Sequence, residues 1–416
     1  MAVCIAAPSA FRRESVSPRP DWRATAARYG FDFHTLDGAP YWTEDACYAF
    51  SLPAIETDLE AATTELAALC QAVVERAAGD AEVLESLAIP EPYWDRVRNS
   101  WQSRERELYG RFDLVYDGCG PARLLEYNAD TPTALYESAF FQWLWLEEAM
   151  ALGLIPRGSD QFNSIQEALI DGFASLGPGY GPLAGPFLGG ETLYFTAVAD
   201  HREDQGTLLY LRDCAAQAGL ATATLPITAI GLNGDGFLTD GDDRIIRALF
   251  KLYPWEFLVR EPFGPVLTTP QAPLMVEPAW KMILANKGVL VWLWRLFPGH
   301  PNLLPAAFAD TREAAAIVGS RFVRKPLLSR EGANIHIHDP ALPGGALTTP
   351  GPYGQEGAVL QGLAPLPVFT GPDGRRHHTV IGSWWVAGRA CGIGIREDDG
   401  PITRDTSRFV PHRIDP

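Results

Sequence analysis

The segment from Tyr109 to Thr133, YGRFDLVYDGCGPARLLEYNADTPT, predicts a β-hairpin, and this hairpin decides how the rest of the chain is interpreted. Apolar and polar residues alternate over residues 111–116 and again over residues 122–128, which is typical of half-buried strands. Between them, residues 117–120 (Asp-Gly-Cys-Gly) have the composition of a tight turn. We therefore expect two antiparallel strands joined by a short turn.

If the two strands pair symmetrically about the turn, Asp113 lies opposite Glu126 and Arg111 lies opposite Asn128. All four side chains then project from one face, because side chains on a strand repeat every second residue. Two carboxylates that face each other repel unless something cationic lies between them. The oxygens of Asp113, Glu126 and Asn128 suit Mg²⁺, so the hairpin predicts a magnesium site. The alternative is an ordinary surface hairpin with one polar face.

The composition indicates a large folded protein. Its 416 residues allow two or three domains, and 47% hydrophobic with 20% charged residues is usual for globular proteins. Because the net charge is −17 and no long basic run exists, we expect no nucleic-acid partner. An acidic surface also suits a polyamine or another cationic substrate, although acidity commonly serves solubility alone.

Cysteine usage and hydropathy favour a cytoplasmic protein without a membrane segment. The six cysteines have neither paired nor metal-ligand spacing, as in proteins of a reducing compartment. No apolar run reaches the length of a transmembrane helix, and residues 1–10 lack the basic start of a signal peptide. The oligomeric state stays open.

Hydrophobic periodicity divides the chain into four regions. We expect an N-terminal helical region (1–100), the hairpin with a following helix (101–176), an α/β subdomain (177–276) and a C-terminal region with two lysines, a glycine-containing loop and a hinge strand (277–416). Helices are predicted over residues 53–78, 90–108, 134–152 and 278–298. In the third of these we expect an aromatic stripe to lie in the core, namely Phe140, Phe141, Trp143 and Trp145.

The second half of the chain contains mainly strands. A Gly/Pro-rich break over residues 177–190 precedes a strand–helix–strand unit (192–200, 206–219 and 221–230). Further strands are predicted over residues 321–326, 358–363, 378–387 and 390–396. The Gly/Pro/Thr-rich segment 340–357 is long enough for a mobile lid.

Two lysines in the C-terminal region are candidates for phosphate binding. Lys325 ends a predicted strand and is followed by a small polar loop with Ser329 and Gly332, which places an ammonium and backbone N–H groups near a bound phosphate. The order of a Walker A loop is absent, and an exposed loop with a solvated lysine is the alternative. Lys287 precedes an apolar helical stretch.

The strand over residues 358–363 is a candidate for adenine binding. Its backbone, up to Leu363, can bond the edge of the base, and Gln361 can accept from the exocyclic amine. A plain strand-end glutamine is an equal alternative for Gln361.

Several segments resemble the synthetase domain of the glutathionylspermidine synthase family, and the loop and hairpin also resemble those of D-alanine–D-alanine ligase. The family segments are 125–133, 277–281, 286–287, 324–334, 382–385, 392–397 and 409–412. The resemblance covers about residues 40–416. It implies an α+β fold, a circularly permuted ATP-grasp with an inserted α/β (preATP-grasp-like) subdomain, because the hairpin precedes the lysines.

The resemblance also implies roles for individual residues. Asp113, Glu126 and Asn128 would hold two Mg²⁺ ions on ATP, and Arg111 would contact the transferred phosphoryl group. Lys287 and Lys325 would bind the α- and β-phosphates under the loop Ser329–Gly332, where Arg330 swings toward the site. Arg396 would face the substrate carboxylate and its acyl phosphate, and a rim ion pair with Glu397 or Asp398 is the alternative.

The implied reaction is amide formation between a small carboxylate and a small amine, with ADP and phosphate released. Glu203 and Asp204 match acidic residues that receive a polyamine, although acids at a helix N-terminus are also ordinary caps. Thr131 and Thr133 stand where glutathione-using enzymes have serines. No amidase domain is expected. A ligase for unrelated peptide or amino-acid substrates and a catalytically silent ATP-binding partner protein are the alternatives.

Overall fold

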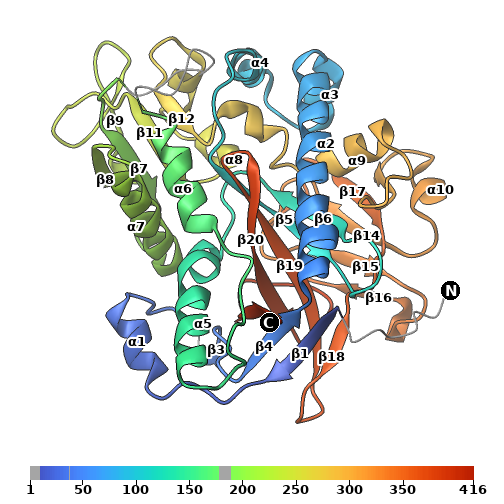
Figure 1. Ribbon diagram of the computed structural model, residues 1–416. Coiled ribbons are helices and arrows are strands. Elements are labelled where there is room, and N and C mark those ends of the chain that lie inside the picture. Colours follow the sequence, from blue (N-terminus) through green and yellow to red (C-terminus); the bar gives the residue numbers. More distant parts are fainter. Residues whose placement is uncertain (1–9, 37, 178–188) are drawn as a thin grey trace.

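The computed structural model describes residues 10–36, 38–177 and 189–416, and its centre is a sheet of six strands. Figure 1 shows the C-terminal strands β19 and β20 crossing the middle of the molecule, with the early hairpin beside them. The strands are β21 (Arg408–Val410), β20 (Arg389–Asp398), β19 (Arg376–Val386), β5 (Tyr109–Val115) and β6 (Arg123–Asn128) in this order, with β18 (Val368–Thr370) also paired to β19.

The predicted hairpin is confirmed, including the register of its functional face. Asp113 pairs with Glu126 and Arg111 with Asn128. The pairing is not symmetric toward the turn, because a β-bulge follows Asp113 and brings Leu114 opposite Leu124. One residue of β6 therefore has no partner on β5 at this point.

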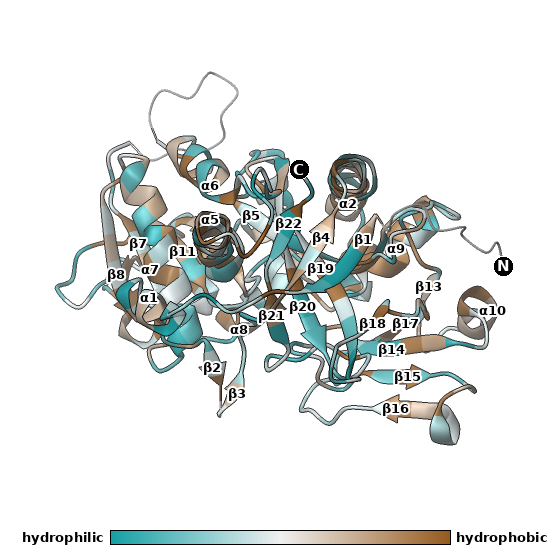
Figure 2. Ribbon diagram, turned by 60° about the horizontal axis from the view of Figure 1, so that its bottom comes forward, coloured by the Kyte–Doolittle hydropathy of each residue, from teal (hydrophilic) through white to brown (hydrophobic). Residues whose placement is uncertain are grey.

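A second, antiparallel sheet contains the predicted phosphate-binding lysine. Its strands are β13 (Ala306–Phe308), β17 (Ala358–Gly362), β14 (Phe322–Pro326), β15 (His336–His338) and β16 (Ala346–Thr348). Figure 2 shows β14, β15 and β16 as one layer beside β19 and β20. The prediction that residues 340–357 form a loop is partly wrong, because the segment contains the turn η7 (Pro343–Gly345) and strand β16, which pairs with β15.

The third sheet is parallel and contains the predicted strand–helix–strand unit. It consists of β12 (Leu274–Val276), β11 (Ala248–Leu252), β7 (Leu193–Ala197) and β8 (Thr222–Pro226). Helix α7 (Arg202–Gln217) connects β7 to β8 and packs against α6 (Ile165–Ala174). The predicted break at residues 177–190 lies almost wholly outside the described residues.

The long N-terminal helix is confirmed, and it covers the central sheet. It begins as a π-helix, η1 (Ala54–Glu60), and continues as α2 (Ala61–Ala78), which packs on β19 and β20. The second predicted helix ends earlier than expected, as α4 (Trp94–Gln102). The helix predicted over 278–298 is two short pieces, η6 (Ala279–Met282) and α9 (Val289–Leu296).

The aromatic helix is formed by η3 (Glu137–Phe141) and α5 (Gln142–Ala151), but its stripe is only partly core. Phe141 and Trp145 are fully buried, whereas Trp143 is 46% exposed. Residues four apart share a helix face and residues two apart do not, so burial of Phe141 and Trp145 turns Trp143 toward solvent.

The remaining elements are short. The helices are α1 (Trp22–Arg28), α3 (Ala81–Ser86), η2 (Glu91–Tyr93), η4 (Ile227–Ala229), α8 (Trp255–Leu258), η5 (Gly264–Thr268) and α10 (Ala314–Val318). A small sheet joins both ends of the described chain through β1 (Phe11–Ser15), β4 (Ala46–Phe50) and β22 (His412–Ile414), and two ribbons pair β2 (Thr35–Leu36) with β3 (Ala39–Pro40) and β9 (Gly231–Leu232) with β10 (Leu238–Thr239). Among the described residues, no helix combines the length and apolar character needed to cross a membrane.

A buried ion pair anchors the start of β5 to the end of β12. The carboxylate of Glu277 accepts the backbone N–H groups of Leu108 and Tyr109 at 3.1 Å. Lys281 lies 2.9 Å from Glu277 and donates to the carbonyl of Tyr109 at 2.7 Å. Both side chains are fully buried. Lys281 also lies 3.1 Å from Glu107, whereas the Glu277 carboxylate depends on Lys281 for compensation of its charge.

We predict that Lys281→Met lowers the free energy of unfolding by about 3 kcal/mol or more, because it leaves the Glu277 carboxylate buried without its cation. Urea denaturation measures this loss. The double variant Glu277→Gln/Lys281→Met removes both charges and is expected to recover part of the stability. A loss below about 1 kcal/mol in Lys281→Met would contradict the role of this pair.

Candidate active site

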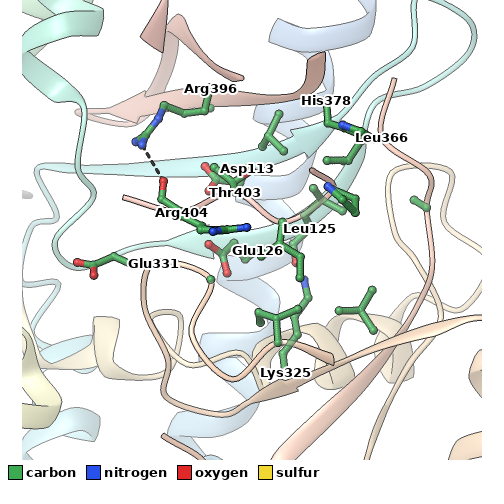
Figure 3. Close-up of a pocket in the computed structure, with 18 of the residues that line it drawn as sticks. Asp113, Leu125, Glu126, Lys325, Glu331, Leu366, His378, Arg396, Thr403 and Arg404 are labelled. Carbon is green, nitrogen blue, oxygen red and sulfur yellow. Dashed lines mark hydrogen bonds between the residues drawn. The ribbon is translucent and has the colours of Figure 1, made fainter. Parts of the chain in front are cut away.

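One cavity of about 470 Å³ lies between the hairpin and the antiparallel sheet (Figure 3). It brings together every predicted site residue except Glu203 and Asp204. The residues from the prediction that line it are Arg111, Asp113, Glu126, Asn128, Thr131, Thr133, Lys287, Lys325, Ser329, Arg330, Gly332, Gln361, Leu363 and Arg396.

Two cationic side chains of the protein hold the opposed carboxylates. Arg111 donates twice to Asp113, at 2.7 and 3.0 Å, and Lys287 lies 3.1 Å from Glu126. The amide nitrogen of Asn128 donates to Asp113 at 3.0 Å and to Glu126 at 3.3 Å. Arg111 and Lys287 therefore supply the positive charge that the paired acids were expected to need.

The surroundings of the two acids shift their pKa values in opposite directions. Burial raises the pKa of Asp113, because desolvation outweighs the attraction of Arg111. Burial also acts to raise the pKa of Glu126, but the ammonium groups of Lys287 and Lys325 outweigh it and lower that pKa to about 2. Glu126 is therefore the more firmly ionised of the two.

The oxygen donors on the hairpin fit a hard divalent ion. The described residues contain no cluster of three His, Cys, Asp or Glu side chains with metal-site geometry, so an ion here would take two carboxylates, the amide oxygen of Asn128 and further oxygens from a ligand. This donor set is the kind that Mg²⁺ takes with a nucleotide. To offer its oxygen, the Asn128 amide must turn, because its nitrogen now faces both acids.

Lys325 projects from β14 to the base of the cavity. Its ammonium donates to the carbonyl of Leu125 and to Gln361 Oε1, both at 2.8 Å. Burial lowers the pKa of Lys325 to about 8, and the charge of Lys287 acts in the same direction.

The adenine-binding candidates are already engaged within the protein. Gln361 is 2% exposed, accepts from Lys325 and donates to the carbonyl of Leu124 at 2.9 Å. The backbone N–H of Leu363 donates to the carbonyl of Arg321 at 3.0 Å. Apolar side chains nearby, including Ile335 and Ile337, line this end of the cavity.

The glycine-containing loop lies against a second loop from the C-terminal region. Gly332 has a φ of +69°, and a Cβ atom there would lie 2.5 Å from the carbonyl oxygen of Thr403, so only glycine fits this approach. Lys287 donates to the carbonyl of Ser329 at 2.7 Å. Arg330 points to Glu256 of α8, at 3.2 Å.

Arg396 holds this C-terminal loop. Its guanidinium donates to the carbonyl of Arg404 at 2.8 Å (Figure 3). It also donates to the carbonyls of Asp405 at 2.8 Å and Ser407 at 3.0 Å. Among the described residues no ion pair joins Arg396 to Glu397 or Asp398, so the rim ion pair, which was the alternative interpretation of Arg396, is wrong.

Glu203 and Asp204 open α7 and do not line the cavity. The N-cap of this helix is His201, whose ring nitrogen accepts from the backbone N–H of Asp204 at 3.3 Å. Neither acid is therefore the cap residue itself. Burial raises the pKa of Glu203, and the charge of Arg396 opposes the rise.

Sequence reasoning missed Glu137, a fully buried acid beside Arg396 and Glu203. Tyr41 donates its hydroxyl to one carboxylate oxygen of Glu137, and the other has no hydrogen-bond partner among the described residues. Burial, with the charge of Glu203 second, raises the pKa of Glu137 to about 7. The only signal in the sequence is a lone acid before an aromatic run.

Comparisons with known proteins agree with this architecture. The model of the family described as glutathionylspermidine synthase preATP-grasp matches residues 13–415. A protein of Haemophilus influenzae named "Putative acid–amine ligase" is 38% identical over 411 residues, which cover 96% of this chain and 98% of that protein.

Other relatives are longer proteins. Trypanothione synthetase of Crithidia fasciculata is 29% identical over 80% of this chain, and the bifunctional glutathionylspermidine synthetase/amidase of Escherichia coli is 26% identical over 86%. The chain spans 51% and 57% of their lengths.

Among solved structures, a glutathione synthetase-like effector from Globodera pallida superposes with a TM-score of 0.55 at 10% identity, covering 96% of this chain and 98% of that one, which supports the fold. The family match and the 38% identity across nearly the whole chain show that this protein belongs to the glutathionylspermidine synthase preATP-grasp family.

Proposed function

We propose that this protein is an ATP- and Mg²⁺-dependent carboxylate–amine ligase of the ADP-forming, ATP-grasp type. The observation that carries the proposal is the meeting, in one cavity, of two opposed carboxylates from the hairpin with two lysines from the second half of the chain. The family match and the name of the Haemophilus influenzae relative support it.

In the proposed reaction, an oxygen of the substrate carboxylate attacks the γ-phosphorus of ATP, and the bond to the β-phosphate oxygen breaks. ADP leaves and an acyl phosphate forms. The amine nitrogen then attacks the carbonyl carbon and loses a proton, and phosphate departs. Such transfers need positioned positive charge more than a covalent nucleophile.

The residues of the cavity fit these needs. Lys287 and Lys325 would hold the phosphates near Glu126, and Arg111 would hold the transferred group beside Asp113. Bound Mg²⁺, one or two ions, would neutralise phosphate charge at Asp113, Glu126 and Asn128. Arg396 would exchange its loop carbonyls for oxygens of the acyl phosphate, because its present partners are uncharged.

The amine is proposed to approach beside Arg396, where the carboxyl groups of Glu137, Glu203 and Asp204 lie near one another. The buried oxygens of Glu137 and Glu203 that lack partners among the described residues suit an ammonium group. Thr131 and Thr133 line the cavity where the acid would bind. The names of the relatives make glutathione-like acids and polyamine-like amines the first pair to test.

We further propose that the hairpin and the antiparallel sheet form a circularly permuted ATP-grasp core. In this division, residues 101–176 and 277–416 supply the core, residues 177–276 are the inserted α/β subdomain, and residues 1–100 pack on the core. The order of the motifs along the chain supports it, since the hairpin precedes both lysines.

We predict that ADP and phosphate appear in equal amounts only when the protein receives ATP, Mg²⁺ and a matching acid–amine pair. A panel of carboxylates crossed with amines, including glutathione and spermidine, tests this. Asp113→Asn should reduce turnover at least 100-fold, because it removes one of the two opposed negative charges that would hold Mg²⁺ on the nucleotide. Asp95→Asn, at a side chain 88% exposed on α4, is the matched control. Normal turnover in Asp113→Asn would contradict the proposed site.

The pKa of Lys325, about 8, predicts how ATP binding depends on pH. The ammonium is charged below this value and must regain a proton to bind phosphate above it. ATP should therefore bind about tenfold more weakly at pH 9 than at pH 7. Calorimetric titration at both pH values measures the difference.

Lys325→Arg is the control for this pH dependence, because a guanidinium stays charged throughout the range. The variant should lose the tenfold difference. Equal ATP affinity at the two pH values in the unaltered protein would place Lys325 outside the phosphate site.

A further inference from the structure

Two backbone carbonyls of the edge strand β6 face the antiparallel sheet at the β-bulge of the hairpin. After Asp113 the register shifts by one residue, so Leu125 has no partner on β5. The carbonyl of Leu125 accepts from Lys325 at 2.8 Å, and that of Leu124 accepts from Gln361 at 2.9 Å. The antiparallel sheet therefore makes its polar contact with the central sheet at the β-bulge.

Gln361 links Lys325 to the backbone of β6 through two hydrogen bonds. It lies on the interior strand β17, between Ala306 of β13 and Val323 of β14, and is buried. Its Oε1 accepts from Lys325 and its Nε2 donates to Leu124. This orientation of the amide follows from chemistry, because an ammonium can only donate and a carbonyl can only accept.

These contacts leave one N–H group of Lys325 available for a ligand. An ammonium has three N–H groups, and two of them bond Leu125 and Gln361. The third is available to an acceptor in the cavity, which Lys325 lines together with Glu126 and Lys287. Lysine side chains are otherwise flexible, so the two fixed acceptors restrict where the third N–H points.

We propose that Gln361 is a positioning residue that orients the Lys325 ammonium toward a phosphate oxygen of the nucleotide, and that its side chain does not contact the base. This inference rests on the proposed function, because it takes the cavity to bind ATP. It replaces the expectation that Gln361 accepts from the exocyclic amine of adenine. The oxygen of Gln361 already accepts from Lys325.

The test compares two nucleotides that differ only in that amine. Calorimetry measures the affinity of ATP and of purine riboside triphosphate, with Mg²⁺, for the unaltered protein and for Gln361→Leu. A positioning role predicts that both nucleotides bind about tenfold more weakly to the variant, by the same factor, because a charge-assisted hydrogen bond is lost in each case. A larger loss for ATP than for the analogue would show contact with the base and overturn the inference.

A double-mutant cycle separates positioning from a merely structural role. If Gln361 acts through Lys325, then Gln361→Leu has no further effect on ATP affinity in a Lys325→Met background. Additive losses would overturn the inference. Gln361→Met, which keeps the length of the side chain without either hydrogen bond, provides the same measurement if Gln361→Leu does not fold.

The failure of the proposed function would look different. If the unaltered protein binds neither nucleotide, the ATP site itself is contradicted, and the role of Gln361 with it. If the unaltered protein binds both and Gln361→Leu binds them with unchanged affinity, only the role of Gln361 is overturned.

Discussion

The structure depends on the placement of two carboxylates, Asp113 and Glu126, directly opposite each other on one hairpin. Their repulsion has to be balanced wherever they lie, and the protein balances it with cations from separate parts of the chain: Arg111 on the same strand, and Lys287 and Lys325 from more than 150 residues away. Such a site is suited to a metal–polyphosphate complex, because a metal ion can replace the protein cations at the carboxylates and the phosphates can then pair with those cations. The cavity lies where these charges meet.

The hairpin is also the common partner of the other two large sheets. Glu277 and Lys281 bind the start of β5 to the end of β12. At the same open end of the hairpin, Asp130, two residues after Asn128, pairs with buried Lys251 of β11 and accepts the backbone N–H of Trp255 at the start of α8. The bulge meets β14 and β17 through Lys325 and Gln361. Because each contact is polar, buried and directional, it fixes position as well as adding stability. The segment 277–281, part of the family resemblance, contributes no residue to the cavity and acts through this anchoring.

Strand alternation and residue chemistry are local signals, and they were sufficient for the hairpin and its register at Asp113 and Arg111. Several other residues of the cavity, such as Arg396 and Thr131, were predicted from the family resemblance. The bulge could not be predicted, since it depends on how β5 pairs with β6 and β19 together. The partners of Gln361 could not be predicted either, because Leu124 lies more than 200 residues away in the sequence. Glu137 was missed because its neighbours Tyr41 and Glu203 come from distant segments. Trp143 was misplaced because a run rich in aromatic residues has no visible polar face, and only packing decides which ring turns outward.

The central claim is that a substrate carboxylate is activated in this cavity as an acyl phosphate, and transfer of an oxygen isotope tests it most directly. An acid labelled with ¹⁸O in its carboxylate is incubated with the protein, ATP, Mg²⁺ and the matching amine, and the phosphate released is analysed by mass spectrometry. The account predicts one ¹⁸O atom in each phosphate, because the carboxylate oxygen that attacks phosphorus leaves with it. Label in AMP, or amide formed with unlabelled phosphate, would contradict it.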